Sequence, residues 1–294
     1  MNGKFLEQNI RLEVKGYHLF GILSEPNKKA SRAVIIVVGG PQYRVGSHRQ
    51  FILLARHLAR QGVLVLRFDY SGMGYSEGFA KKFYEIDEDL RAAVDFIACE
   101  NTQIKNICVW GLCDAASAIA FSAHTDDRIK GIVLLNPWVR DEASHSKAIL
   151  KNYYRDRLFS PDVWKQLLRS PAKIFRAVAS IAKITLKVLK SRSSSFAPVQ
   201  ADHISIAERE QNIAAAVLKG MSHFKGRICL ILSGKDLVAD EFKQLLEDRE
   251  WLENDENRGK TRVVHVNEAD HTFSSKNLRS KVENVTLDFV NAIA

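Results

Sequence analysis

The hydrophobic pattern of the chain alternates between short apolar runs and segments with helical spacing. Runs of this kind are typical of strands that are buried on both faces of a sheet. They lie at 33–38, 63–68, 106–110, 132–135, 228–232 and 262–266. Apolar residues recur every three or four positions in the predicted helices, at 48–60, 85–99, 114–123, 206–219, 238–252 and 277–292. This alternation predicts an α/β fold with a mostly parallel sheet and helices on both faces.

Two segments depart from the alternation. Residues 8–14 and 17–24 alternate apolar and polar positions, which predicts a hairpin at the start of the sheet. Residues 138–205 are helical in pattern, basic and aromatic, and they follow the fourth buried strand. We therefore predict a core domain formed by 1–137 and 206–294, with 138–205 inserted as a helical cap, or lid.

Composition narrows the class of protein. The chain has 294 residues, of which 46% are hydrophobic and 26% charged, and this excludes a disordered or low-complexity protein. It has no run of 18 uncharged apolar residues, and residues 1–10 do not read as a signal peptide. Its four cysteines form no CxxC pair. We expect a reduced, cytoplasmic protein.

The net charge of +9 is concentrated in the predicted cap. Residues 140–200 hold 13 basic and 4 acidic side chains, whereas the rest of the chain holds 30 of each. Five of the basic residues mark one face of a predicted helix, namely Lys173, Arg176, Lys183, Lys187 and Lys190. Such a face binds an anionic membrane surface or an anionic partner, or is simply a solvated surface. Basic and aromatic residues do not interleave here, so we do not expect nucleic-acid binding.

The clearest chemical signal lies at the end of the third buried strand, in Gly111-Leu112-Cys113-Asp114-Ala115. Small residues two positions before and after Cys113 allow a sharp turn from strand to helix, which presents the thiol alone above the sheet. The N-terminus of the following helix favours negative charge there, and so favours the thiolate. The pattern predicts that Cys113 is a nucleophile rather than a structural cysteine.

Two later strand ends supply partners for this thiol. Asp236 follows the strand at 228–232, and His271 follows the strand at 262–266. The chain order Cys, Asp, His matches that of strand-end catalytic triads. We predict that His271 acts as general base and that Asp236 holds its imidazole. Asp240 is an alternative to Asp236 as the acid. For Asp270 and Glu268, the alternative role is only to cap the loop.

Acyl transfer also needs two backbone N–H donors for the developing oxyanion. We predict that Asp114 provides one and Gly40 the other, with Gln42 as the alternative to Gly40, since residue 41 is a proline. Gln42 and Trp138 are weak candidates for the substrate pocket, and His48 is a further one.

No sequence pattern indicates a cofactor or a metal. The glycine-containing stretch at 69–76 lacks the spacing of a phosphate-binding or dinucleotide-binding loop, so we interpret it as a structural turn. The histidines are scattered and form no metal-ligand spacing. The sequence does not indicate the oligomeric state.

Taken as a set, the motifs resemble the α/β-hydrolase superfamily. They are GGP, DYSGMGYS, GLCDA, SGKD and DHTF, in this order. More narrowly, GGPQYRVGSHRQF, RFDYSGMGYSEG and WGLCDAAS resemble the exosortase A system-associated hydrolase 1 family. The resemblance implies an eight-stranded α/β-hydrolase fold with a lid after the sixth strand. It also implies a bacterial, cytoplasmic or membrane-peripheral protein linked to exopolysaccharide and protein-sorting systems.

These observations favour a thiol-dependent acyl hydrolase that acts on a small ester or thioester. An acyltransferase with the same three residues is the nearest alternative, because the sequence does not show what resolves the acyl-enzyme. The alternative from another class is a non-catalytic protein that binds a lipid or a membrane complex through the same fold and the basic cap.

Overall fold

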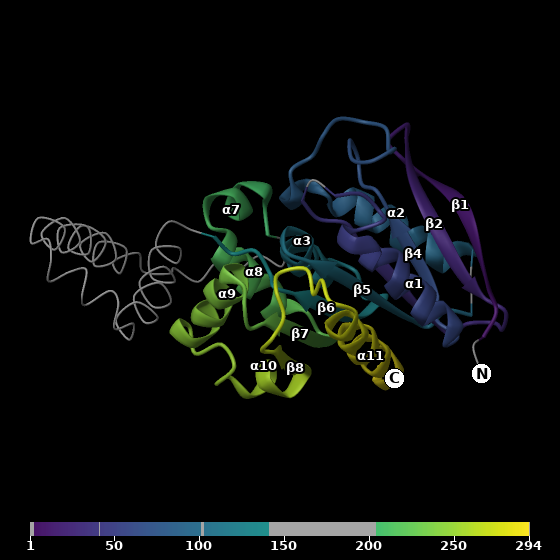
Figure 1. The fold of residues 1–294 in the computed structure, drawn as a ribbon. Helices are drawn as coiled ribbons and strands as arrows, with labels where there is room; N and C mark the ends of the chain where they lie inside the picture. The colour runs from purple at the N-terminus through teal and green to yellow at the C-terminus, as the bar shows by residue number, and fades with distance from the viewer. Residues whose placement is uncertain (1–2, 41, 101–102, 141–203, 294) are drawn as a thin grey trace, which may run out of the picture.

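The computed structural model describes residues 3–40, 42–100, 103–140 and 204–293. Its centre is one sheet of eight strands in the order β1-β2-β4-β3-β5-β6-β7-β8 (Figure 1). The strands are β1 (Phe5–Val14), β2 (Tyr17–Pro26), β3 (Arg32–Val37), β4 (Leu64–Phe68), β5 (Asn106–Leu112), β6 (Ile129–Leu135), β7 (Arg227–Ser233) and β8 (Thr261–Val266). The six strands from β3 to β8 are parallel, and β2 pairs antiparallel with both β1 and β4.

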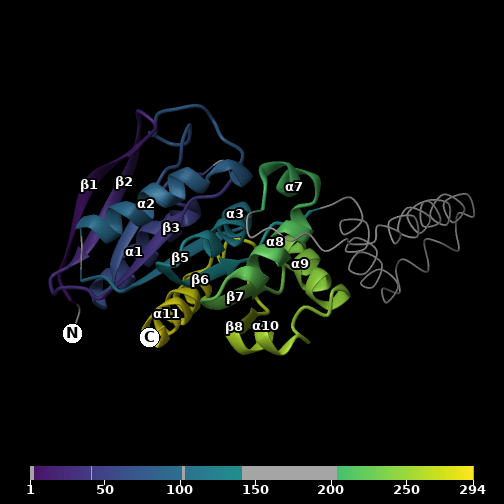
Figure 2. The ribbon, with the colours of Figure 1, turned by 180° about the vertical axis from the view of Figure 1, so that it is seen from behind.

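Helices cover both faces of this sheet (Figures 1 and 2). The α-helices are α1 (Gln50–Arg60), α2 (Asp87–Glu100), α3 (Asp114–Ser122), α7 (Ile206–Gln211), α8 (Ile213–His223), α9 (Leu237–Asp248), α10 (Asp255–Lys260) and α11 (Lys276–Ala292). Short 3-10 turns are η1 (Ser47–Arg49), η2 (Phe83–Glu85) and η3 (Ala123–Thr125). The predicted α/β class and mostly parallel sheet are confirmed.

The sheet separates two apolar cores. One face of the sheet packs against α2, α3, α8 and α9, and the other packs against α1 and α11. Because side chains alternate along a strand, Ile35 of β3 enters the first core, while Val34 and Ile36 enter the second. Strands with both faces covered must be apolar throughout, which explains their continuous runs in the sequence.

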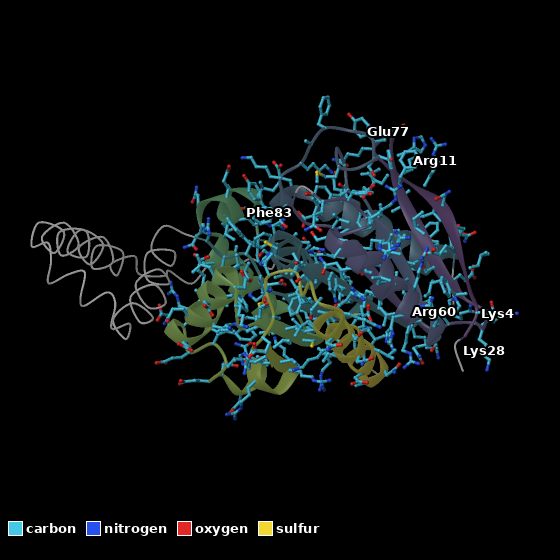
Figure 3. All side chains as sticks on the ribbon, in the orientation of Figure 1. Lys4, Arg11, Lys28, Arg60, Glu77 and Phe83 are labelled. Atoms are coloured by element: carbon cyan, nitrogen blue, oxygen red, sulfur yellow. The ribbon has the colours of Figure 1, made fainter. Side chains whose placement is uncertain are left out.

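The N-terminal hairpin forms as predicted and closes one edge of the sheet. Every residue of β1 pairs with β2, from Phe5 opposite Pro26 to Val14 opposite Tyr17. The loop after β4 contacts this hairpin, since Glu77 Oε2 accepts a hydrogen bond from the His18 N–H at 2.9 Å. Figure 3 labels Glu77, which lies on this loop.

Two sequence predictions need correction. The single helix predicted at 206–219 is two helices, because Asn212 adopts φ −150° and its side chain caps α8 by accepting from the Ala215 N–H. The predicted helix at 238–252 ends at Asp248, and the short helix α10 follows it. The first change occurs where the Asn212 side chain caps α8. The second occurs beside Glu250, whose φ of 48° is not helical.

The predicted cap at 138–205 lies almost entirely outside the described residues, which end at 140 and resume at 204. Both of its described flanks are anchored. Arg140 stacks on the Trp138 ring at 4.5 Å, and the buried Arg209 pairs with Asp87 at 2.6 Å. Within the described part of the chain, no helix combines the length and apolarity that crossing a membrane requires.

Candidate active site

Cys113 sits on a sharp turn between β5 and α3. Its backbone has φ 62° and ψ −124°, a conformation that non-glycine residues rarely adopt. The small neighbours predicted from the sequence make this turn possible. A Cβ on Gly111 would lie 2.5 Å from Ile119 Cδ1, and Ala115 is buried against the sheet. The thiol is therefore lifted above the carboxyl end of the parallel strands.

The turn is fixed by backbone hydrogen bonds to the neighbouring strand. The Cys113 N–H donates to Leu135 O at 2.9 Å, and the Trp138 N–H donates to Cys113 O at 3.2 Å. Ser117, one turn into α3, donates its hydroxyl to Trp138 O. Hydrogen bonds to β6 and to the residues that follow it thus stabilise the strained turn.

His271 and Asp236 lie together at the same edge of the sheet. His271 Nδ1 and Asp236 Oδ2 are 2.8 Å apart, and the Asp236 side chain is 8% exposed. Asp236 is also the N-cap of α9, since its carboxylate accepts the N–H groups of Val238 and Ala239 at 3.2 Å. The helix N-terminus thus holds this carboxylate in place while it holds the imidazole.

The pKa of His271 is raised by its contacts with Asp236 and Cys113. The hydrogen bond to Asp236 raises the pKa of His271 to about 10, and a hydrogen bond with the Cys113 side chain adds to this, against the effect of burial. The structure therefore brings Cys113, His271 and Asp236 into one chain of contacts. The imidazole therefore favours its protonated form near neutral pH.

Sequence reasoning missed Asn136, which positions the histidine loop. Asn136 is fully buried directly after β6, and its Nδ2 donates to Ser233 Oγ at 2.7 Å and to His271 O at 3.1 Å. Its Oδ1 accepts the Ser233 N–H at 2.9 Å. The available signal was a polar residue that ends an apolar strand.

One of the two predicted oxyanion donors is occupied in this structure. The Gly40 N–H donates to Asp114 Oδ2 at 2.8 Å, and the Ala115 N–H donates to Asp114 Oδ1 at 2.9 Å. The sequence predicted a role for the backbone N–H of Asp114, whereas the structure shows that its side chain also reaches the loop after β3. The donor role of Gly40 and Asp114 stays a prediction.

Comparison with known proteins places this geometry in a family. Residues 29–271 match the family model described as serine aminopeptidase, S33. The chain belongs to this family. Cys113 stands at the elbow of this S33-family protein, where the family's name leads one to expect a serine. No curated protein matches the chain.

Solved structures support the α/β-hydrolase fold of this S33-family protein. The chain is similar to the esterase Pf2001 of Pyrococcus furiosus, with a TM-score of 0.63, 15% identity, and coverage of 98% of this chain and 92% of that one. It is similar to Est1E of Butyrivibrio proteoclasticus, solved with ferulic acid, with a TM-score of 0.60, 15% identity, and coverage of 97% and 98%. It is also similar to the α/β hydrolase GrgF of Penicillium sp. sh18, with a TM-score of 0.63, 18% identity, and coverage of 98% and 99%.

The weaker pocket candidates of the S33-family protein lie around the same edge. Gln42 accepts the Ser47 N–H at 2.9 Å and lines a hollow of about 340 Å³ with Tyr43, Met73 and Tyr75. Trp138 is half-buried and bonded to the Cys113 carbonyl through its backbone. His48 is exposed.

The remaining acids have other partners. Asp240 pairs with Lys243 at 3.2 Å, and Glu268 pairs with Lys235 at 2.7 Å. Asp270 accepts the Ser274 N–H at 3.0 Å, which matches the loop-capping alternative. Asp236 is the carboxylate that His271 contacts.

The other strand cysteines differ sharply from Cys113. Cys108 and Cys229 are buried inside strands, and burial raises the pKa of both thiols, that of Cys229 to about 12. They are packing residues in the core. Across the described ranges, no group of three or more His, Cys, Asp or Glu side chains is placed to hold a metal ion.

The glycine-containing loop after β4 contacts the segment that follows β3. The buried Asp69 carboxylate accepts the Arg44 N–H at 2.6 Å and pairs with the Arg44 guanidinium. It also accepts the Tyr75 N–H at 3.3 Å. A Cβ on Gly74 would lie 2.2 Å from Asp69 Oδ2, so the turn requires glycine there. The loop ties the segments after β3 and β4 together.

The raised pKa of His271 has a consequence for stability. A histidine whose pKa is about 10 in the folded state, against 6.5 ordinarily, stabilises the fold fully below pH 6.5 and loses that effect as the pH rises through about 10. We expect wild type to melt above His271→Gln near neutral pH, and this difference to shrink above the folded-state pKa. Melting curves of both proteins at about pH 7 and about pH 10.5 measure it. A difference that stays constant or grows would contradict the contact.

Asn136→Ala should lower both stability and activity. The substitution removes three buried hydrogen bonds, which costs about 3 kcal/mol and about 6–12 °C in Tm. Because one of them holds the His271 carbonyl, kcat should fall more than KM changes. Asn106→Ala is the matched control, since it removes a bond to the Ile293 carbonyl at the other end of β5. Equal loss of activity in both variants would argue against a positioning role.

Proposed function

We propose that the protein is a thiol-dependent acyl hydrolase that cleaves esters or thioesters. Cys113 is the nucleophile, His271 carries the proton, and Asp236 orients and charges the imidazole. The observation that supports this is a thiol on a strained turn beside an imidazole that is hydrogen-bonded to a buried carboxylate. Membership of the S33 family and the esterase-like fold agree with ester chemistry.

In the first half-reaction, the Cys113 thiolate adds to the acyl carbon. The sulfur–carbon bond forms and the carbonyl electron pair moves to the oxygen. When this pair returns, the bond to the leaving oxygen or sulfur breaks, and the leaving group takes the proton of the His271 imidazolium. The product is a thioester on Cys113 and a neutral imidazole.

In the second half-reaction, water resolves the thioester. The imidazole left neutral by the first half-reaction accepts a proton from water, while the Asp236 carboxylate supports the imidazolium that forms. The resulting hydroxide adds to the acyl carbon, the carbon–sulfur bond breaks, and the acid leaves. The thiolate and the imidazolium are then restored.

The experiment is a substrate panel with purified wild-type protein. It contains p-nitrophenyl acetate and butyrate, a short acyl thioester and a ferulate ester, the last because Est1E was solved with ferulic acid. We expect turnover of at least one compound, abolished by prior alkylation with iodoacetamide. Turnover that survives complete alkylation of Cys113, or none on the whole panel, would contradict the proposal. Transfer of the acyl group to an added alcohol, in preference to water, would identify an acyltransferase.

The cellular role of the protein is also a proposal. The resemblance to exosortase A system-associated hydrolases suggests a role beside bacterial exopolysaccharide export, with the basic residues of the predicted cap on an anionic membrane surface. Those basic residues lie outside the described part of the chain. Sedimentation with anionic and neutral vesicles tests the idea, because binding should require the anionic lipid and fall with salt.

A further inference from the structure

The Asp114 carboxylate is the feature of this site that the proposed reaction does not use. It follows the nucleophile directly, and its two oxygens accept the Gly40 N–H at 2.8 Å and the Ala115 N–H at 2.9 Å. An acyl oxyanion above Cys113 would need the N–H groups of Gly40 and Asp114. The carboxylate thus takes one of the two predicted donors, the Gly40 N–H.

The loop after β3 passes close to the elbow and to this side chain. A Cβ on Gly39 would lie 2.2 Å from Asp114 Oδ1 and 2.9 Å from both Ala115 N and Leu112 O, so this close approach requires glycine. Gly40 has φ 60°, a conformation that favours glycine. Both glycines therefore support the approach that brings the Gly40 N–H to the carboxylate.

The groups around the Asp114 carboxylate shift its pKa in opposite directions. Burial raises the pKa of Asp114, whereas the backbone N–H groups and His271 act in the opposite direction. The buried Tyr70 is close enough for the Asp114 charge to contribute to raising the pKa of Tyr70. A carboxylate held by backbone N–H groups and facing His271 repels a second negative oxygen at the same place.

We propose that Asp114 controls access to the oxyanion donors: in the free enzyme its carboxylate takes the Gly40 N–H, and it must turn away before a substrate carbonyl can be attacked. This inference rests on the proposed function. When the side chain leaves, the N–H groups of Gly40 and Asp114 turn to the carbonyl oxygen as the Cys113 sulfur adds to the carbon. Substrates are thereby selected by their ability to displace the carboxylate, and a simple acyl ester, which offers it no N–H or O–H donor, reacts slowly.

The test compares two reactions of Cys113 in the full chain. Acylation by p-nitrophenyl acetate passes through an oxyanion and is followed by the release of p-nitrophenolate. Alkylation by iodoacetamide displaces iodide directly and forms no oxyanion. The ratio of the two rates reports on the oxyanion donors alone, because any change in thiolate content alters both rates.

Asp114→Ala should raise the ratio of acylation to alkylation about tenfold or more, since it frees donors of the kind whose individual loss costs at least that much. Asp114→Asn keeps the size of the side chain and removes its charge, so it should raise the ratio by a smaller factor. If the Ala variant does not fold, the Asn variant decides the question. Asp127→Ala is the matched control and should leave the ratio unchanged. The Asp127 carboxylate is 86% exposed, and it precedes β6, at the end of that strand opposite to the elbow.

The outcomes separate this inference from the proposed function. If wild type and both Asp114 variants acylate Cys113 with the same ratio, or if the ratio falls in the variants, the control by Asp114 is wrong and the acyl-hydrolase proposal stands. If iodoacetamide alkylates Cys113 but no variant is acylated there, both proposals are wrong. A rise confined to the Asp114 variants supports both.

Discussion

Cys113→Ala should lower kcat/KM for the best ester or thioester by about 10⁴-fold or more. Without the thiol, water must attack the acyl carbon directly, and that reaction has a much higher barrier. The fold should survive, since alanine is smaller than cysteine and the thiol is only partly buried. Initial rates of the purified variant, with circular dichroism as the check on folding, provide the measurement.

Cys99→Ala is the matched control for this result. Cys99 is an exposed thiol on α2, and its loss should leave kcat/KM unchanged. Cys113→Ser adds a second comparison, because it retains a nucleophilic atom at the elbow but not a thiolate. A Cys113→Ala variant that keeps more than about a tenth of the wild-type rate would contradict the proposed nucleophile.

Asp236→Asn should lower kcat/KM by about 10³–10⁴-fold, because an amide in place of the carboxylate favours the wrong imidazole tautomer and withdraws the charge that supports imidazolium. The variant isolates this effect well. Asn is as good an N-cap as Asp, so α9 keeps its first turn, and stability should change little. Steady-state kinetics and a melting curve measure the two quantities.

Asp240→Asn distinguishes between the two carboxylates that the sequence allowed. Asp240 lies one turn along α9 and pairs with Lys243, with its side chain 30% exposed against 8% for Asp236. We expect its replacement to change kcat/KM less than about threefold, as for a surface substitution. A loss in Asp240→Asn as large as that in Asp236→Asn would show that the acid has been assigned to the wrong residue.

Much of the fold was predictable because buried strands leave a direct trace in the sequence. A strand covered on both faces needs consecutive apolar residues, and the runs around Ile35, Leu66 and Leu230 follow that rule. The order Cys113, Asp236, His271 was equally visible, since these residues lie three, four and five positions after the predicted strands that end at 110, 232 and 266. Parallel strands then bring their carboxyl ends to one edge.

What the sequence concealed depends on contacts between residues that lie far apart in the chain. Nothing local shows that Asn136 bonds to residues 97 and 135 positions away. The occupation of the Gly40 N–H by Asp114, 74 positions later, is hidden for the same reason. Helix ends such as Asn212 were missed because a side-chain cap competes with continued helix, and propensity alone does not decide that competition.

During turnover, Cys113 should carry the acyl group. Acid quenching of the wild-type protein during the reaction with p-nitrophenyl acetate, followed by proteolysis and mass spectrometry, measures this. We expect one acetyl group, on the peptide that contains Cys113, and none in Cys113→Ala. An acetyl group on another residue during productive turnover would show that Cys113 is not the nucleophile. Turnover without acetylated Cys113, in both wild type and His271→Ala, would show the same.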